Sequence, residues 1–182
     1  MKSVQALVLT TLLSALLAVP ASAKEKKSTG SAKTSSSGKS GGRQGTWMER
    51  SDAKGYTIKM PADATEKRDE WTTTYVATLP PDAALIKTSV SVEMLDEFTA
   101  VTNLDKAVEA VLAARPRGMQ ASISEQKELP NGYLVVIGPE YDTYAVDVIR
   151  NGKEVQVKAH CTGPSSRLDE LKELCLSVKP TK

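Results

Sequence analysis

The 182-residue chain has little of what catalytic and metal sites are usually built from. It contains one histidine, two cysteines, one phenylalanine and only 4% aromatic residues. A structural zinc site needs four nitrogen or sulfur ligands at a recognisable spacing, which one histidine and two cysteines cannot supply. The motifs of serine hydrolases and zinc metalloproteases are absent, and the scattered glycines form no phosphate-binding loop. We therefore expect no cofactor, no metal site and no catalytic residue, and predict a non-enzymatic protein.

The first 23 residues have the layout of a signal peptide. A lysine precedes an apolar run over residues 4–19, and Ala21-Ser22-Ala23 after it forms a small-x-small cleavage site. The run is shorter than the ~20 apolar residues that a membrane span needs. No cysteine follows it to carry a lipid. We predict cleavage after Ala23 and a secreted or periplasmic product without stable membrane insertion, in a compartment where disulfides persist.

Charge and apolar content divide the remaining chain at residue 45. Residues 24–45 contain no Leu, Ile, Val, Met or aromatic residue, and carry six Lys or Arg against one Glu. Such a segment cannot bury enough apolar surface to offset the entropy of ordering it, so we predict a disordered tether. Residues 46–182 carry 17 Lys or Arg against 21 Asp or Glu and are long enough for a single domain. An acidic domain without a basic, aromatic-rich stripe argues against nucleic-acid binding. The basic tether is suited to weak contact with an anionic envelope surface.

Hydrophobic periodicity predicts an α+β domain. Strict alternation over 85–95 indicates a strand with one wet face, and Tyr133–Gly138 is apolar on both faces, as in a covered central strand. A period of 3.6 over Thr102–Pro116 indicates a helix, with Thr102 and Asp105 as capping residues. Further strands are expected at 55–61, 71–79, 121–129, 143–150 and 153–161, the last two joined at Asn151-Gly152. Together these patterns indicate an antiparallel β-sheet with helices packed on its faces.

The segment Val155–Val178 holds both cysteines and the only histidine. Along a strand Cys161 and His160 point to opposite faces, so they cannot form a thiolate–imidazolium pair. A second amphipathic helix, capped by a serine, follows the loop Thr162–Pro164 and carries Cys175 on its apolar stripe. We predict a structural disulfide between Cys161 and Cys175. His160 is expected to be an ordinary histidine on the solvent side, although any Ser-His-Asp triad would have to use it.

Carboxylates in two loops are the remaining candidates for a site. Glu140, Asp142 and Asp147 lie in one acidic stretch and Asp96-Glu97 in another, and neither has the spacing of a calcium loop. We take Glu140, Tyr141 and Asp142 as the candidate surface for a ligand or a partner. Aromatic residues that could contribute to an exposed patch are Trp47, Trp71, Tyr133, Tyr141 and Tyr144. The alternative to an interaction module is an exported enzyme, or a protein that binds a small ligand or a metal, using these acidic loop residues.

Four stretches occur in an order that resembles the PsbP/Mog-like superfamily, in particular its small secreted bacterial members: GYTIKMPADAT, NLDKAVEAVLAA, PNGYLVVIG and KAHCTGPSSRLDELKELCLSVKP. The resemblance covers about residues 55–180 and implies an α/β/α sandwich. Better-known relatives are extrinsic photosystem II subunits and a Ran-binding nuclear factor, which act by binding larger assemblies. The resemblance brings no catalytic residues. It implies an accessory module of the cell envelope whose partner is another envelope or secreted protein.

Overall fold

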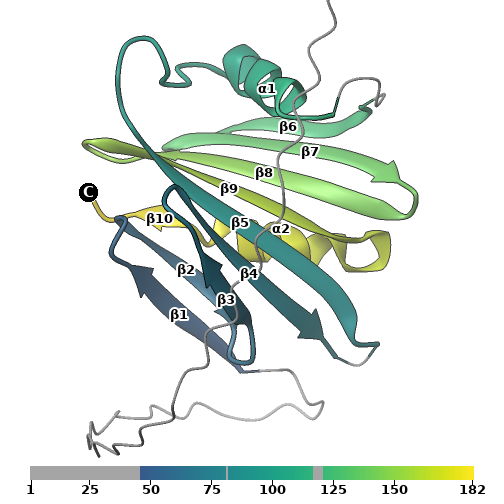
Figure 1. Cartoon of the computed structure of the whole chain (residues 1–182). Helices are drawn as coiled ribbons and strands as arrows, with labels where there is room; N and C mark the ends of the chain where they lie inside the picture. Colours follow the sequence, from purple (N-terminus) through teal and green to yellow (C-terminus); the bar gives the residue numbers. More distant parts are fainter. Residues whose placement is uncertain (1–45, 81, 117–120) are drawn as a thin grey trace, which may run out of the picture. The chain divides into compact units, whose positions relative to one another are not determined.

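Two antiparallel sheets make up most of the computed structural model, which describes residues 46–80, 82–116 and 121–182. The main sheet has seven strands in the order β3-β4-β5-β9-β8-β7-β6, and a smaller sheet has three in the order β1-β2-β10 (Figure 1). The described part of the chain also contains two α-helices, neither of them long and apolar enough to cross a membrane. The predicted signal peptide and tether lie outside the described residues.

The strands of the main sheet are β3 (Thr65–Arg68), β4 (Thr72–Leu79), β5 (Ala84–Met94), β6 (Ile123–Leu129), β7 (Gly132–Glu140), β8 (Thr143–Asn151) and β9 (Val155–Pro164). The small sheet consists of β1 (Trp47–Asp52), β2 (Tyr56–Pro61) and β10 (Lys179–Pro180). The helices are α1 (Leu104–Ala113) and α2 (Leu168–Leu176), with a 3₁₀ turn, η1 (Ser165–Arg167), before α2. The sequence pattern predicted most of these elements but missed β1, β3 and β10, which are short or largely exposed.

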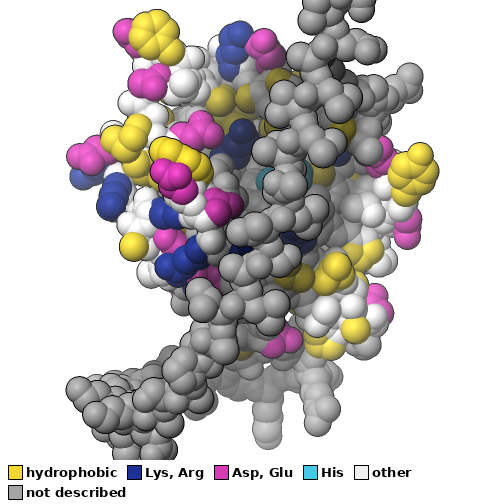
Figure 2. All heavy atoms as spheres, viewed as in Figure 1, with side chains coloured by type: hydrophobic (Ala, Val, Ile, Leu, Met, Phe, Trp, Pro, Cys, Tyr) yellow, Lys and Arg dark blue, Asp and Glu magenta, His cyan; other side chains and the backbone are white. Residues whose placement is uncertain are grey.

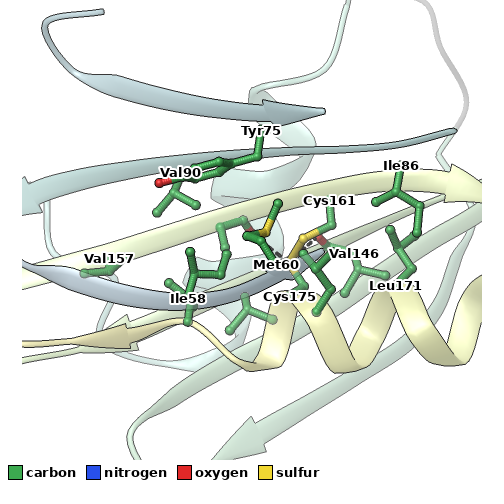
Figure 3. Close-up of a cluster of buried hydrophobic side chains, with 14 of the residues drawn as sticks. Ile58, Met60, Tyr75, Ile86, Val90, Val146, Val157, Cys161, Leu171 and Cys175 are labelled. Carbon is green, nitrogen blue, oxygen red and sulfur yellow. Dashed lines mark hydrogen bonds between the residues drawn. A yellow bond between two sulfur atoms is a disulfide. The ribbon is translucent and has the colours of Figure 1, made fainter. Parts of the chain in front are cut away.

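The two helices pack on opposite faces of the main sheet. Helix α1 buries Ala107 and Val111 in a small cluster with residues of β7 and β8. Helix α2 and the small sheet cover the other face and enclose the larger core (Figure 3). The fold is therefore antiparallel α+β, as predicted. The α/β/α sandwich of the resemblance describes it only in part, because a second sheet shares the α2 face and α1 covers only the β6–β8 half of its own face.

Strand β7 is buried from Gly132 to Gly138, with both of its faces covered. Leu134 and Val136 belong to the larger core, whereas Val135 and Ile137 pack in the α1 cluster. The expectation that the run at 133–138 is covered on both sides is confirmed. The strand is not central, however, because only β6 separates it from the sheet edge.

The Cys161–Cys175 disulfide joins β9 to α2, as predicted, with Cα atoms 6.0 Å apart. Both cysteines are completely buried in the larger core (Figure 3). Strand β9 extends through Pro164, so the residues expected to form a loop continue the strand. Ser165 and Ser166, the expected helix caps, lie in η1, and no side-chain hydrogen bond caps α2.

A buried hydrogen-bond network connects the small sheet to the main sheet. Asp52 Oδ2 accepts hydrogen bonds from the Tyr56 and Thr73 hydroxyls, each at 3.2 Å, and Asp52 Oδ1 accepts the Lys54 backbone N–H at 2.9 Å. The Arg68 guanidinium lies 3.6 Å from Asp52 Oδ2. Burial alone would raise the pKa of Asp52, but the Lys54 N–H, the Arg68 charge and the two hydroxyls hold that pKa below its usual value. The network therefore stabilises a charged carboxylate between the sheets.

Helix α1 is capped by Asn103 rather than by the predicted Thr102. The Asn103 side-chain oxygen accepts the Lys106 backbone N–H at 2.9 Å. We expect Asn103→Ala to lower the free energy of unfolding by about 1 kcal/mol, because this N–H loses its partner. The neighbouring Thr102→Ala is the matched control and should change it by less than about 0.5 kcal/mol. Urea unfolding of both variants checks the assignment, and an equal loss in both would contradict it.

Candidate functional site

Two turns with the same sequence pattern stand at one end of the main sheet. Residues 69–72 read Asp-Glu-Trp-Thr and residues 96–99 read Asp-Glu-Phe-Thr. In each turn, Oδ1 of the Asp accepts the backbone N–H groups of the aromatic residue and of the Thr, at distances between 2.6 and 3.0 Å. These donors, with the threonine N–H foremost, hold the pKa of Asp69 and Asp96 below its usual value. Each turn is thus an Asx turn closed by a charged carboxylate.

The two turns line the same groove, which has a volume of about 630 Å³. The Trp71 side chain of the first turn lines this groove and is 69% exposed. Phe98 of the second turn is 89% exposed, and Met94, which ends β5 inside the groove, is 66% exposed. We call this site the aromatic groove. Two large apolar side chains, Trp71 and Met94, therefore stand in water in the lining of one groove, and Phe98 is exposed on one of the two turns that form it.

The aromatic groove is predominantly acidic. Its lining contains two cationic side chains, from Lys54 and Lys182, and four carboxylates, from Glu70, Glu93, Asp96 and Glu154. On the left of the view in Figure 2, hydrophobic side chains lie among acidic and basic ones. Among the described residues, no group of three or more His, Cys, Asp or Glu side chains is placed to hold a metal ion. The groove thus combines an apolar rim with a negative lining.

Sequence reasoning identified only parts of the aromatic groove. Trp71 was a candidate aromatic residue and Asp96-Glu97 a candidate acidic loop, but Phe98 and Met94 were not considered. Of the other aromatic candidates, Tyr133 is buried under α1 and Tyr144 is half-buried against the larger core. The repeated Asp-Glu-aromatic-Thr pattern is the signal that could have located the site.

The predicted surface at Glu140, Tyr141 and Asp142 is the tight hairpin between β7 and β8. Tyr141 and Asp142 have positive φ angles of 46° and 63°, as a type I′ turn requires, and Tyr141 is 96% exposed. Glu140 pairs with Arg115 at 3.2 Å, and the Asp142 carboxylate accepts the Ser165 hydroxyl. Both carboxylates are thus bonded within the chain. The hairpin lies at the opposite end of β8 from the β8–β9 loop that lines the aromatic groove.

His160 points away from Cys161 and is exposed, as predicted, but its ring is held by a buried carboxylate that was not expected. Its Nδ1 lies 2.9 Å from Oδ1 of Asp147, a residue that is only 4% exposed on the neighbouring strand β8. On the other side, Ser89 of β5 is its register partner. The three residue types of a hydrolytic triad therefore stand in one row. The Ser89 hydroxyl, however, lies 3.4 Å from the Thr74 hydroxyl of β4, on the side of β5 opposite His160. Asp147 therefore orients the imidazole, but the imidazole does not activate a serine.

Comparison with known proteins supports the fold. No protein-family model and no curated protein matches the chain. Among solved structures, it is similar to cyanobacterial PsbP (CyanoP) from Synechocystis sp. PCC 6803, with a TM-score of 0.51 and 13% identity, over 79% of this chain and 98% of that one. A protein from Bacteroides thetaiotaomicron VPI-5482 is matched with a TM-score of 0.38 and 12% identity, over 70% of this chain and 45% of that one. The chain therefore has a PsbP-like fold, in agreement with the resemblance of its sequence.

Proposed function

We propose that the protein is an exported, non-enzymatic interaction module that binds a segment of another envelope or secreted protein in the aromatic groove. The observation that carries this proposal is the meeting of both Asp-Glu-aromatic-Thr turns at one groove, with Trp71 69% and Met94 66% exposed in its lining. An exposed tryptophan beside another large apolar side chain in a depression is typical of protein-binding sites, where such residues contribute most to affinity.

The charge of the groove indicates what kind of segment fits it. Because four carboxylates line it against two lysines, a segment with Lys or Arg beside an apolar anchor is complementary in charge and in polarity. Binding of the partner segment as an extra strand at a sheet edge is less favourable than binding in the groove. The edge strands of the main sheet, β3 and β6, read Thr-Glu-Lys-Arg and Ile-Ser-Glu-Gln-Lys-Glu-Leu, and charged residues at an edge oppose pairing with another strand.

The cellular setting of the proposal rests on other features. The signal-peptide pattern of residues 1–23 and the buried Cys161–Cys175 disulfide both support an oxidising compartment outside the cytoplasm. The PsbP-like fold supports an accessory role only by analogy, since one fold serves many functions. The specific support for a binding function therefore comes from the aromatic groove and not from the fold.

The proposal can be tested with a displayed library of random twelve-residue peptides selected against the intact protein. We expect the selected peptides to combine an aromatic or large aliphatic residue with Lys or Arg. Trp71→Ala should weaken the binding of a labelled synthetic peptide at least about tenfold, because aromatic residues central to an interface commonly contribute about 2 kcal/mol or more. Fluorescence anisotropy of the labelled peptide measures the affinity.

Tyr141→Ala provides the matched control, because it removes an aromatic residue that is even more exposed, 96% against 69% for Trp71, from the β7–β8 hairpin. It should leave peptide affinity unchanged. If Tyr141→Ala weakens binding and Trp71→Ala does not, the partner surface is the Glu140–Asp142 hairpin and the groove proposal is wrong. A library that yields no peptide sensitive to Trp71→Ala also rejects the groove as the binding site.

A further inference from the structure

A second cavity, of about 280 Å³, lies between the C-terminal end of α1 and strands β8 and β9. Val111 of α1 and Ala114, the residue just after this helix, form its apolar side. Its polar side is formed by side chains from three parts of the chain: Arg115, Asp147, Lys158, His160 and Thr162. This cavity shares no lining residue with the aromatic groove. Its chemistry is therefore independent of the function proposed above.

The His160 ring in this cavity is held by a carboxylate that is almost entirely buried. Asp147 Oδ1 lies 2.9 Å from His160 Nδ1, and the Asp147 side chain is 5% exposed against 46% for His160. The second carboxylate oxygen, Oδ2, is buried and has no hydrogen-bond partner among the described residues. With Nδ1 directed at Asp147, the Nε2 edge of the ring is left for the cavity.

A structural role alone does not explain the carboxylate at position 147. The neighbouring residues on the same strand face, Ala145 and Ile149, belong to the apolar α1 cluster. A buried carboxylate oxygen without a donor is destabilising, so an apolar side chain would suit this position better for folding. Groups that break such a packing rule are expected where a function needs them. Here the carboxylate orients the His160 ring.

Among the described charged groups of this corner, Lys158 is the cation that has no carboxylate partner. Lys158 lies two residues before His160 on the same face of β9 and is half-buried, and Arg115 lies two residues beyond the end of α1. Of the carboxylates facing these groups, Asp147 bonds to His160 and Glu140 pairs with Arg115 at 3.2 Å. Lys158 forms no ion pair among the described residues. It is thus a cation available to a ligand beside an oriented imidazole.

We propose that this cavity binds a small oxyanion, a phosphate or a carboxylate group, through Lys158, His160 and Thr162. The Lys158 ammonium supplies charge, and His160 Nε2 binds through a proton that it shares with the oxyanion. The Thr162 hydroxyl donates to the Lys87 carbonyl at 3.5 Å, a long hydrogen bond that it would exchange for one to the ligand. Hydrogen bonds between charged groups are the strong ones, and a partly enclosed, apolar-walled cavity strengthens them. The ligand is a small molecule or a small exposed group, because 280 Å³ is at the lower end of the volumes of ligand pockets.

The test exploits the presence of a single histidine in the chain, which gives one set of imidazole signals in NMR spectra. Inorganic phosphate and acetate are titrated separately into the intact protein at constant ionic strength. Saturable shifts of the His160 imidazole signals are expected. Lys158→Gln should weaken the affinity about tenfold, since it removes one charge-assisted hydrogen bond. Thr162→Val, which keeps the shape of the side chain, should weaken it by a smaller factor.

Lys127→Gln is the matched control, because it removes the same charge from an exposed lysine on β6 outside the cavity. It should leave the titration unchanged. Binding of both anions supports a general oxyanion site, and binding of only one identifies the ligand group. The proposal is overturned if neither anion gives a saturable shift, or if Lys127→Gln weakens binding as much as Lys158→Gln does. Dispersed amide spectra of each variant show that a loss of binding is not a loss of fold.

Discussion

Replacing Cys161 and Cys175 together by alanine is expected to lower the free energy of unfolding by about 3 kcal/mol. The bond spans 14 positions of sequence, and without it the unfolded chain gains the conformations that loop closure removes. The native state also loses contacts, since both side chains are fully buried between β9 and α2. The strand and the helix remain covalently consecutive through η1, so we expect a folded but less stable protein.

Urea unfolding with and without a reductant separates the effect of the bond from that of the substitutions. The oxidised natural chain should lose stability on reduction, whereas the double alanine variant should be insensitive to the reductant. Mass analysis without reduction should show the natural chain two hydrogens lighter than its thiol form. Equal unfolding midpoints for the oxidised and reduced natural chain would contradict a stabilising role of the disulfide.

The disulfide was predictable because it depends only on local periodicity. On a strand, alternate residues share a face, so Cys161 had to point away from His160, and on a helix Cys175 had to join the apolar stripe. Neither inference requires knowledge of which strands are neighbours in the sheet. The short connection between β9 and α2 then left the two cysteines on facing surfaces. The start of α1, by contrast, depends on which residue caps the helix. The sequence pattern predicted Thr102, whereas the cap is the next residue, Asn103.

The partner of His160 was missed because it depends on strand register. A two-residue turn at Asn151-Gly152 would pair Asp147 with Gln156. In the structure Asn151 itself pairs with Gln156, so the connection is longer and Asp147 lies opposite His160. Asn-Gly correctly marked a hairpin, but the turn type sets the register and the sequence signal did not specify it. A shift of this kind keeps every residue on its predicted face while changing its neighbours.

The aromatic groove was within reach of sequence reasoning. The turn at residues 80–82 was predicted to join two strands, and a β-hairpin brings the start of its first strand beside the end of its second. Thr72 of β4 indeed pairs with Ser91 of β5. The two Asp-Glu-aromatic-Thr turns flank these ends, so their proximity follows from the hairpin. The Asp52 network was less accessible, because its residues come from strands of two different sheets and β1 was not predicted.

Asp52→Asn is expected to lower the free energy of unfolding by about 2–3 kcal/mol at neutral pH, because hydrogen bonds to a charged acceptor are each worth about 1.5–3 kcal/mol. The substitution keeps the size of the side chain and removes its charge. The Tyr56 and Thr73 hydroxyls would then donate to a neutral oxygen, and the Arg68 guanidinium would lose its buried counter-charge. The junction between the small sheet and the main sheet should weaken accordingly.

The pH dependence of this loss distinguishes a charge effect from a packing effect. The pKa of Asp52 is lower in the folded protein than its ordinary value of 3.8, so the folded state favours the ionised carboxylate. Its contribution is therefore complete above pH 3.8 and is lost as the pH falls through the lower, folded pKa. The stability difference between the natural chain and Asp52→Asn should consequently shrink in acid. Urea unfolding at a series of pH values measures it, with the exposed Asp63→Asn as the matched control. A difference that stays constant down to about pH 2, below the range in which carboxylates normally titrate, would show that the Asp52 charge does not stabilise the junction.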